Sequence, residues 1–299
     1  MWRIILYSWR IEMFDKIIVV SEVSNASSEM VKCVKSLRSL GAEECLLIQC
    51  FNPQDIDAGV SSYLTSVFNE NLKNQSAMLA EQGFKVKTQI ISGNIKNEIN
   101  RIAQEDQYSL IVVGAENHSI VGSLFLGGIA YDILYGSTKP ILLIKDTNQD
   151  QSIDDTKELM RHILFPTDFS ENADIAFEKV KEMVENGVKK VTIFHIQDES
   201  KINPYLLHRL VEFNEVDNGR LQKLKDELIS LNEVEVEIQI RYGAPTAEII
   251  KLVDKEKIPL IVMGTQGRGF IKEIFLGSVS HNIVRHASAS VLLIPGNRE

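Results

Sequence analysis

The sequence predicts an α/β protein of two consecutive domains, each a parallel sheet with helices on both faces. The chain has 299 residues, a length that accommodates two domains of ordinary size. The second half repeats the first. Within each copy, short strands that are apolar throughout alternate with amphipathic helices, a pattern typical of parallel sheets buried on both faces.

The repeat covers nearly the whole chain and therefore indicates a duplicated domain, since its period is far too long for a solenoid. The strand after Lys16 aligns with the strand after His162 at an offset of 146, and SLIVVG aligns with PLIVMG at an offset of 150. The second copy thus holds extra residues around 200–220. We predict one domain over 13–145, a polar and acidic exposed linker over 146–160, and a second domain over 161–299.

The second copy shows the alternation most clearly. It begins with the apolar strand ILFP. Ser170 is suited to cap the helix that follows, and Gly187 is suited to end it. The apolar positions of this helix recur at three- and four-residue steps: Ala173, Ala176, Val180 and Val184.

The remaining elements follow in the same alternation. They are a strand VTIFHI, an amphipathic stretch over 205–231, a strand EVEIQI, a helix AEIIKLVDKE, a strand LIVMG, a helix SVSHNIVRHA and a strand SVLLIP. Ligands of such sheets bind beyond the carboxyl ends of the strands. We therefore expect the segments that follow ILFP, VTIFHI and LIVMG to lie on one rim.

Composition narrows the classes of partner. The net charge of −9 argues against non-specific binding to nucleic acid or to an anionic membrane surface. No apolar run approaches the roughly 18 residues of a membrane span. The apolar core of the segment before Met13 is too short for a signal peptide, and polar residues interrupt it. We therefore predict that residues 1–12 are a loose extension or that Met13 is the natural start.

The sequence has three cysteines, and no two of them form a CxxC motif: Cys33, Cys45 and Cys50. This spacing favours neither a disulfide framework nor a zinc site, and it fits a reducing compartment. We expect a cytoplasmic protein.

The stretch GTQGRGFIKEIFLGS, residues 264–278, has the properties of an anion site. It joins a buried strand to a helix, and a helix start offers unpaired N–H groups. Gly267 and Gly277 lack a Cβ and would let phosphate oxygens approach, while Ser278 adds a hydroxyl donor. Arg268 is either an anion contact or a solvated surface residue. Glycines at these places are also common turn devices.

Asp168, at the end of ILFPT, lies on the same expected rim. Its carboxylate could accept hydrogen bonds from ribose hydroxyls or help to hold a metal, or it could serve only as a helix-entry residue. His195, at the end of the second strand, is interpreted as a core or rim residue. The sequence contains no P-loop and no nucleophile elbow.

Taken together, HILFPTDFSENA, the strand end HIQD and the pattern G-x2-G-x9-G-S before the last helix resemble the universal stress protein family. The resemblance extends over both copies. It implies two tandem five-stranded parallel-sheet sandwich domains of the Rossmann-like, adenine nucleotide alpha-hydrolase-like type. It also implies an intramolecular pseudo-dimer that pairs through the last strands, ILLIK and SVLLIP.

One branch of that family binds ATP, or ADP or AMP, with Mg²⁺. The resemblance places Asp168 near the ribose, Thr167 near the adenine or sugar, and the backbone of Ile196 at the adenine edge. The implied nucleotide site in the second copy comprises Pro166, Thr167, Asp168, Ile196, Met263, Gly264, Gly267, Arg268, Gly277, Ser278, Val279 and Ser280. The metal ligands stay undefined.

The first copy departs from this pattern while retaining the length of the glycine loop. The residues at the corresponding positions are Val20, Ser21, Glu22, Glu116, Asn117 and Gly128. They remove a close-approach glycine and a hydroxyl, and two carboxylates would repel phosphates. We predict that ATP binds the second domain and not the first.

Three functions remain open at this point. The first is an ATP-binding regulatory protein of the stress response, which is not an enzyme and acts through a partner that the sequence does not identify. The second is a slow ATPase. The third is a pseudo-dimeric scaffold or small-ligand sensor that does not use ATP. Whether two chains associate into a homodimer is also left open.

Overall fold

The computed structural model describes residues 14–21, 25–51, 61–120, 123–125, 128–145, 159–200, 209–267 and 276–296. The predicted extension over residues 1–12 and most of the predicted linker, residues 146–158, lie outside these ranges. Among the described residues, every helix is too short or too polar to cross a bilayer.

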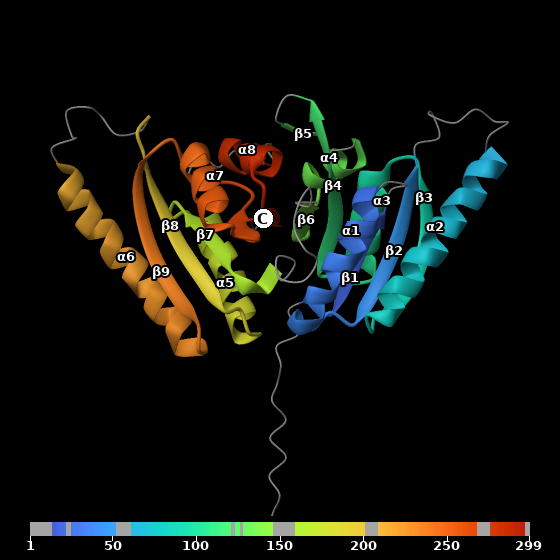
Figure 1. The fold of residues 1–299 in the computed structure, drawn as a ribbon, viewed down its shortest axis with the longest axis horizontal. Coiled ribbons are helices and arrows are strands. Elements are labelled where there is room, and N and C mark those ends of the chain that lie inside the picture. Colours follow the sequence, from blue (N-terminus) through green and yellow to red (C-terminus); the bar gives the residue numbers. More distant parts are fainter. Residues whose placement is uncertain are drawn as a thin grey trace, which may run out of the picture.

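The two halves share one large, mostly parallel sheet (Figure 1). Its strand order is β3-β2-β1-β4-β6-β11-β10-β7-β8-β9, so each half contributes five consecutive strands. In the first half these are β1 Lys16–Ser21, β2 Glu44–Phe51, β3 Lys85–Ser92, β4 Leu110–Ile120 and β6 Ile141–Lys145. In the second half they are β7 Ile163–Thr167, β8 Lys190–Asp198, β9 Glu235–Gly243, β10 Leu260–Gly264 and β11 Ser290–Ile294. The predicted fold class is confirmed.

Helices cover both faces of the sheet. The helices on one face are α1 Asn25–Val34, η1 Lys35–Leu40, α2 Ser61–Glu81, α5 Glu171–Glu185 and α6 Leu210–Leu231. Those on the other face are α3 Ile95–Glu105, α4 Gly128–Leu134, α7 Pro245–Glu256 and α8 Ser278–His286. Successive side chains of a strand point to opposite faces, so Ile17 and Ile18 belong to different core clusters. Each cluster includes residues from both halves.

The halves meet at β6 and β11, which pair antiparallel with Leu142 opposite Leu292. This is the pairing that the family resemblance implies for the last strands of the two copies. Lys145 reinforces the junction: its Nζ donates to the carbonyl oxygens of Ile283, at 3.3 Å, and Ala287, at 2.5 Å. The ammonium of one half thus binds the C-terminal end of α8 in the other half, where the helix dipole favours a cation.

The capping residues expected for α5 occupy their predicted places. Ser170 Oγ accepts a hydrogen bond from the Ala173 amide at 3.3 Å, which satisfies one of the free donors of the first turn. After the helix, Gly187 adopts a φ of 101°, a left-handed conformation that favours glycine.

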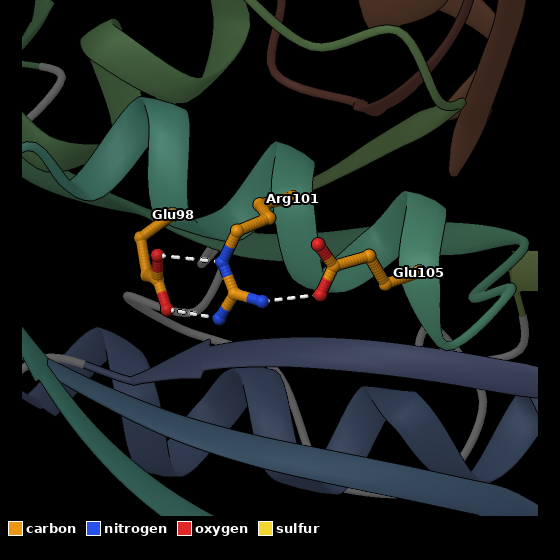
Figure 2. Close-up of polar contacts among 3 residues, drawn as sticks. All are labelled: Glu98, Arg101 and Glu105. Atoms are coloured by element: carbon orange, nitrogen blue, oxygen red, sulfur yellow. Dashed lines mark hydrogen bonds and ion pairs between the residues drawn. The ribbon is translucent and has the colours of Figure 1, made fainter.

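The exposed face of α3 carries a local ion-pair network (Figure 2). The Arg101 guanidinium donates to both carboxylate oxygens of Glu98, at 3.0 and 2.5 Å, and also to Glu105 one turn later. These hydrogen bonds lower the pKa of Glu98 and raise that of Arg101. Because the groups are solvated, the network contributes little to the free energy of unfolding.

Two segments differ from the predicted pattern. In the first half β4 does not stop at Gly114 but continues to Ile120, and it pairs antiparallel with β5 Ser123–Phe125. The first copy of the glycine loop is therefore partly a hairpin. In addition, Leu159 and Met160, the last two residues of the predicted exposed linker, are buried in the 3-10 helix η3 Leu159–Arg161, because their apolar side chains pack into the core that the halves share.

Candidate nucleotide site

A cavity of about 910 Å³ opens at the carboxyl ends of β7, β8 and β10 in the second half. Eleven of the twelve residues implied by the resemblance line this cavity. The twelfth, Arg268, lies outside the described residues. The strand end expected on this rim also lines the cavity through His195, Gln197 and Asp198 of β8. The remaining walls were not suggested by the sequence: Phe213, Asp217 and Arg220 from α6, His281 from α8, and Tyr135 from the first half.

The sheet topology explains the location. β7 lies between β8 and β10, and Leu260 of β10 pairs with Ile163 of β7. The chain leaves β7 toward one side of the sheet and later returns on the other, so the two segments that follow these strands diverge. This is a topological switch point, where open α/β sheets leave a crevice for ligands.

The turn after β7 holds Asp168 in place. Asp168 Oδ1 accepts a hydrogen bond from the Ser170 amide at 3.1 Å, and Thr167 Oγ1 accepts one from the Phe169 amide at 3.0 Å. Phe169 itself has a φ of 58°, which is unusual for a bulky residue. Two side-chain-to-backbone bonds therefore maintain a bent turn that presents the Asp168 carboxylate to the cavity.

Gly267 has a different reason for lacking a side chain from the one that the sequence suggested. A Cβ at this position would stand 2.5 Å from Asp168 Oδ2, well inside van der Waals contact. Asp168 and the glycine loop therefore touch directly. Gly264 is restricted more strongly, because its Cβ would stand 2.8 Å from the backbone oxygen of Asn172.

The N-terminus of α8 opens onto the cavity. Ser278, Val279 and Ser280 line it, and their amides have no acceptor within the helix because they belong to its first turn. Within the described residues no side chain caps this helix. The Ser280 hydroxyl donates to the Gly264 carbonyl at 3.0 Å and so fixes α8 against the end of β10.

The glycine before α8 corrects one expectation. The sequence predicted that phosphate oxygens approach Gly277 because it lacks a Cβ, but its own N–H is not available to them, since it donates to the Thr265 carbonyl at 2.8 Å. The loop closes on itself at this point, so the candidate anion donors are the three amides that follow it.

His195 lies between two protein oxygens, an arrangement that the sequence did not reveal. Its Nδ1 lies 2.8 Å from the Thr167 carbonyl oxygen, and its Nε2 lies 3.4 Å from Asp217 Oδ2. The same Asp217 oxygen accepts a hydrogen bond from Gln197 Nε2 at 2.9 Å. Because both ring nitrogens face protein oxygens, His195 ties α6 to the end of β7 and has no nitrogen directed at a ligand.

An aromatic and cationic stack continues from this pair. The Phe169 ring lies 4.6 Å from the His195 ring, and the Arg220 guanidinium lies 4.7 Å from the centre of Phe169. Arg220 thereby brings a positive charge to the cavity wall. On α8, burial and the cations Arg285 and His286 lower the pKa of His281, which favours its neutral form.

A comparison of the two copies bears on how the contact between His195 and Asp217 could have been found from the sequence. At the 146-residue offset, Gln49 corresponds to His195, and Asn71 of α2 reaches Gln49 much as Asp217 of α6 reaches His195, although the two helix residues do not occupy equivalent positions of the repeat. In the first half Asn71 Nδ2 donates to Gln49 Oε1 at 2.9 Å and to Ser21 Oγ at 3.3 Å. A comparable contact between helix and strand end is thus made by neutral amides in one half and by an imidazole and a carboxylate in the other.

This correspondence gives a testable expectation. We expect His195→Gln and Asp217→Asn each to reduce the free energy of unfolding by about 1–3 kcal/mol, because each leaves a mismatched buried partner. The double variant recreates the amide pair of the first half and should recover part of the loss, with a coupling of about 0.5–3 kcal/mol. Urea unfolding of the four proteins measures this coupling, and strictly additive losses would contradict it.

The described residues contain no group of three or more His, Cys, Asp or Glu side chains arranged to hold a metal ion. The carboxylates that line the cavity, Asp168, Asp198 and Asp217, therefore do not form a metal centre by themselves. None of the three cysteines forms a disulfide bond, as their spacing predicts.

Comparison with known proteins agrees with the fold and the repeat. The model of the universal stress protein family matches twice, over residues 13–145 and 160–295. A universal stress protein of Methanocaldococcus jannaschii is 30% identical over 154 residues, which are 46% of this chain and 95% of that protein. A putative universal stress protein of Staphylococcus haemolyticus is 30% identical over 139 residues, 45% of this chain and 84% of that protein.

Among solved structures, a universal stress protein from Archaeoglobus fulgidus matches almost the whole chain. It covers 95% of this chain and 97% of its own, with a TM-score of 0.69 and 22% identity. At that identity the likeness describes the fold alone, and it extends over both halves.

Proposed function

This chain belongs to the universal stress protein family, and from that premise we propose that the cavity of its second half binds an adenine nucleotide, with ATP as the principal ligand. The bound nucleotide would make the protein a regulatory, ATP-binding member of the stress response that acts in the cytoplasm. The observation that carries the proposal is the direct contact of Asp168 with the glycine loop, beside the uncapped start of α8.

The chemistry of the wall fits the parts of a nucleotide. The first-turn amides of α8 and the hydroxyl of Ser278 are donors for phosphate oxygens. The Asp168 carboxylate is an acceptor for ribose hydroxyls. Ile196, Ile249 and Met263 offer apolar surface for a base. The volume of the cavity, about 910 Å³, is at the upper end of the range typical of small-molecule and cofactor sites.

Magnesium would enter with the nucleotide. The phosphates would supply most of its ligands, as is usual for Mg²⁺, and Asp168 is the residue we would assign to support it. The lack of a carboxylate cluster among the described residues fits an ion that the ligand brings with it.

We propose binding without catalysis. Phosphoryl transfer requires a residue that orients the attacking water or hydroxyl. His195, the most prominent buried base of the wall, has both ring nitrogens occupied by Thr167 and Asp217. Turnover, if any, should be slow.

The test is titration calorimetry on the full chain, together with mass spectrometry of nucleotide released from the purified protein. We expect one ATP per chain, bound by the second half, and an Asp168→Asn variant that binds ATP about tenfold more weakly because a hydrogen bond to a charged group is lost. Glu98→Gln, on the exposed face of α3, is the matched control and should bind ATP normally.

Two outcomes would replace this proposal. If millimolar ATP gave no heat and no nucleotide co-purified, the scaffold or small-ligand sensor would be favoured. If phosphate were released many times per chain and the release stopped in Asp168→Ala, the protein would be an ATPase. Binding of two ATP molecules per chain would contradict the expected asymmetry of the halves.

A further inference from the structure

The first half contributes a residue to the wall of the second-half cavity. Tyr135 directly follows α4, and its amide donates to the Tyr131 carbonyl at 3.1 Å, which continues the helical turn. Its side chain is part of the cavity lining. The segment that leads to it belongs to the half that departs from the nucleotide-binding pattern.

Tyr135 lies next to the start of α8. Its ring meets His281 edge to face, with the ring centres 6.0 Å apart and the planes at 65°. His281 is one residue beyond Ser280 and lines the same cavity. Figure 1 shows α4 and α8 on facing sides of the junction between the halves. The tyrosine is therefore placed at the end of the cavity where the first-turn amides of α8 are available.

The surroundings fix the position of this side chain. The Tyr135 ring stacks on the Tyr131 ring at 4.2 Å, and strand β5 of the first half packs against α8. The other end of α8 is bound by Lys145 of the first half. Because both ends of α8 contact the first half, the distance between Tyr135 and the α8 N-terminus is set by the junction.

The hydroxyl of Tyr135 is suited to donate a hydrogen bond. Burial, the neighbouring Tyr131 and a side-chain hydrogen bond with Tyr131 raise its pKa to about 12, so the phenol keeps its proton at neutral pH and a phosphate oxygen would compete with Tyr131 for it. At the 150-residue offset of the repeat, Arg285 stands where Tyr135 stands, and His281 stands where Tyr131 stands. The two faces of the junction are therefore not equivalent, and the aromatic residue is on the side of the second-half cavity.

We propose that Tyr135 completes the nucleotide site from the other half of the chain, by contacting the distal phosphates of a nucleoside di- or triphosphate. This inference rests on the proposed function and adds selectivity to it. A nucleoside or a monophosphate lacks the distal groups and gains nothing from Tyr135. A polyphosphate bridges the two halves, so its binding stabilises α4 of the first half.

The test compares ATP, AMP and adenosine by calorimetry on the full chain, in the wild type and in Tyr135→Phe and Tyr135→Ala. We expect the affinity for ATP to fall roughly tenfold in Tyr135→Ala, the size of one hydrogen bond to a charged group, while the affinities for AMP and adenosine stay unchanged. Tyr135→Phe keeps the ring and should show most of the same loss. Tyr242→Phe, on β9 and outside the cavity lining, is the matched control.

A second measurement reports the bridge itself. Hydrogen exchange of residues 128–137 should slow when ATP is added to the wild type, should respond less to adenosine, and should not respond in Tyr135→Ala. Circular dichroism checks that the variants fold, and if Tyr135→Ala does not, Tyr135→Phe decides the question.

The outcomes separate the inference from the function on which it rests. If the wild type bound ATP and both Tyr135 variants bound it equally well, the inference alone would be wrong. Equal losses for ATP, AMP and adenosine would also overturn it, since they would indicate a general disturbance of the cavity. If the wild type bound no adenine nucleotide, the proposed function would fail and this inference with it.

Discussion

The Gly267→Ala substitution is expected to weaken ATP binding by about 10- to 100-fold while leaving the free energy of unfolding nearly unchanged. The new methyl group would stand 2.5 Å from Asp168 Oδ2, so the carboxylate must move. The side chain can swing aside at little cost to folding, but a hydrogen bond of a charged group to the ligand, about 1.5–3 kcal/mol, would be lost.

Calorimetry with ATP measures this loss, and two further variants show its cause. Gly219→Ala, on the exposed side of α6 where an added Cβ meets nothing within 4 Å, should leave ATP affinity unchanged. In an Asp168→Ala background, Gly267→Ala should add little, because the group that it displaces is gone. A full additional loss in that background would show that Gly267 acts on the nucleotide directly, as the sequence alone suggested.

Lys145 should impose a rise of stability with pH above neutrality. Burial lowers its pKa in the folded protein from 10.5 to about 7. Between these two values the unfolded chain binds a proton that the folded chain does not, so raising the pH favours the folded state. Below about pH 7 both states carry the proton and the contribution is constant. The slope is at most about 1.4 kcal/mol per pH unit, and the two carbonyls at the end of α8 reduce it by favouring the ammonium.

Urea unfolding between pH 7 and 10 measures this slope. Lys145→Met keeps a long side chain at the junction without a titrating group, and it should remove most of the rise. Lys139→Met is the matched control, since that lysine is only half-buried and should leave the slope as in the wild type. If wild type and Lys145→Met followed the same pH curve, the ammonium would not be the source of the effect.

The sequence by itself determined the repeated α/β architecture. Alternation of apolar strands with amphipathic helices depends on side chains a few residues apart, so the fold and the order of its elements followed from local patterns. The Ser170 cap and the turn at Gly187 are local in the same sense. The pairing of the last strands came from the family resemblance, and the antiparallel register of β6 and β11 confirms it.

The location of the site at the rim of the second half could also be predicted from the sequence, because the carboxyl ends of parallel strands must share one edge. That rule alone places the segments after β7, β8 and β10 together. The nucleotide itself remains a proposal, since a shared edge states where a ligand would bind and not which one does.

Only the tertiary structure decided which side chains meet across long stretches of chain. Asp217 reaches His195 from α6, and Tyr135 reaches His281 from the other half. Asp168 touches Gly267, and the Gly277 amide turns inward to Thr265. These contacts depend on how helices and loops close over the sheet edge, which is set by packing among residues distant in sequence and leaves no periodic trace in any one segment.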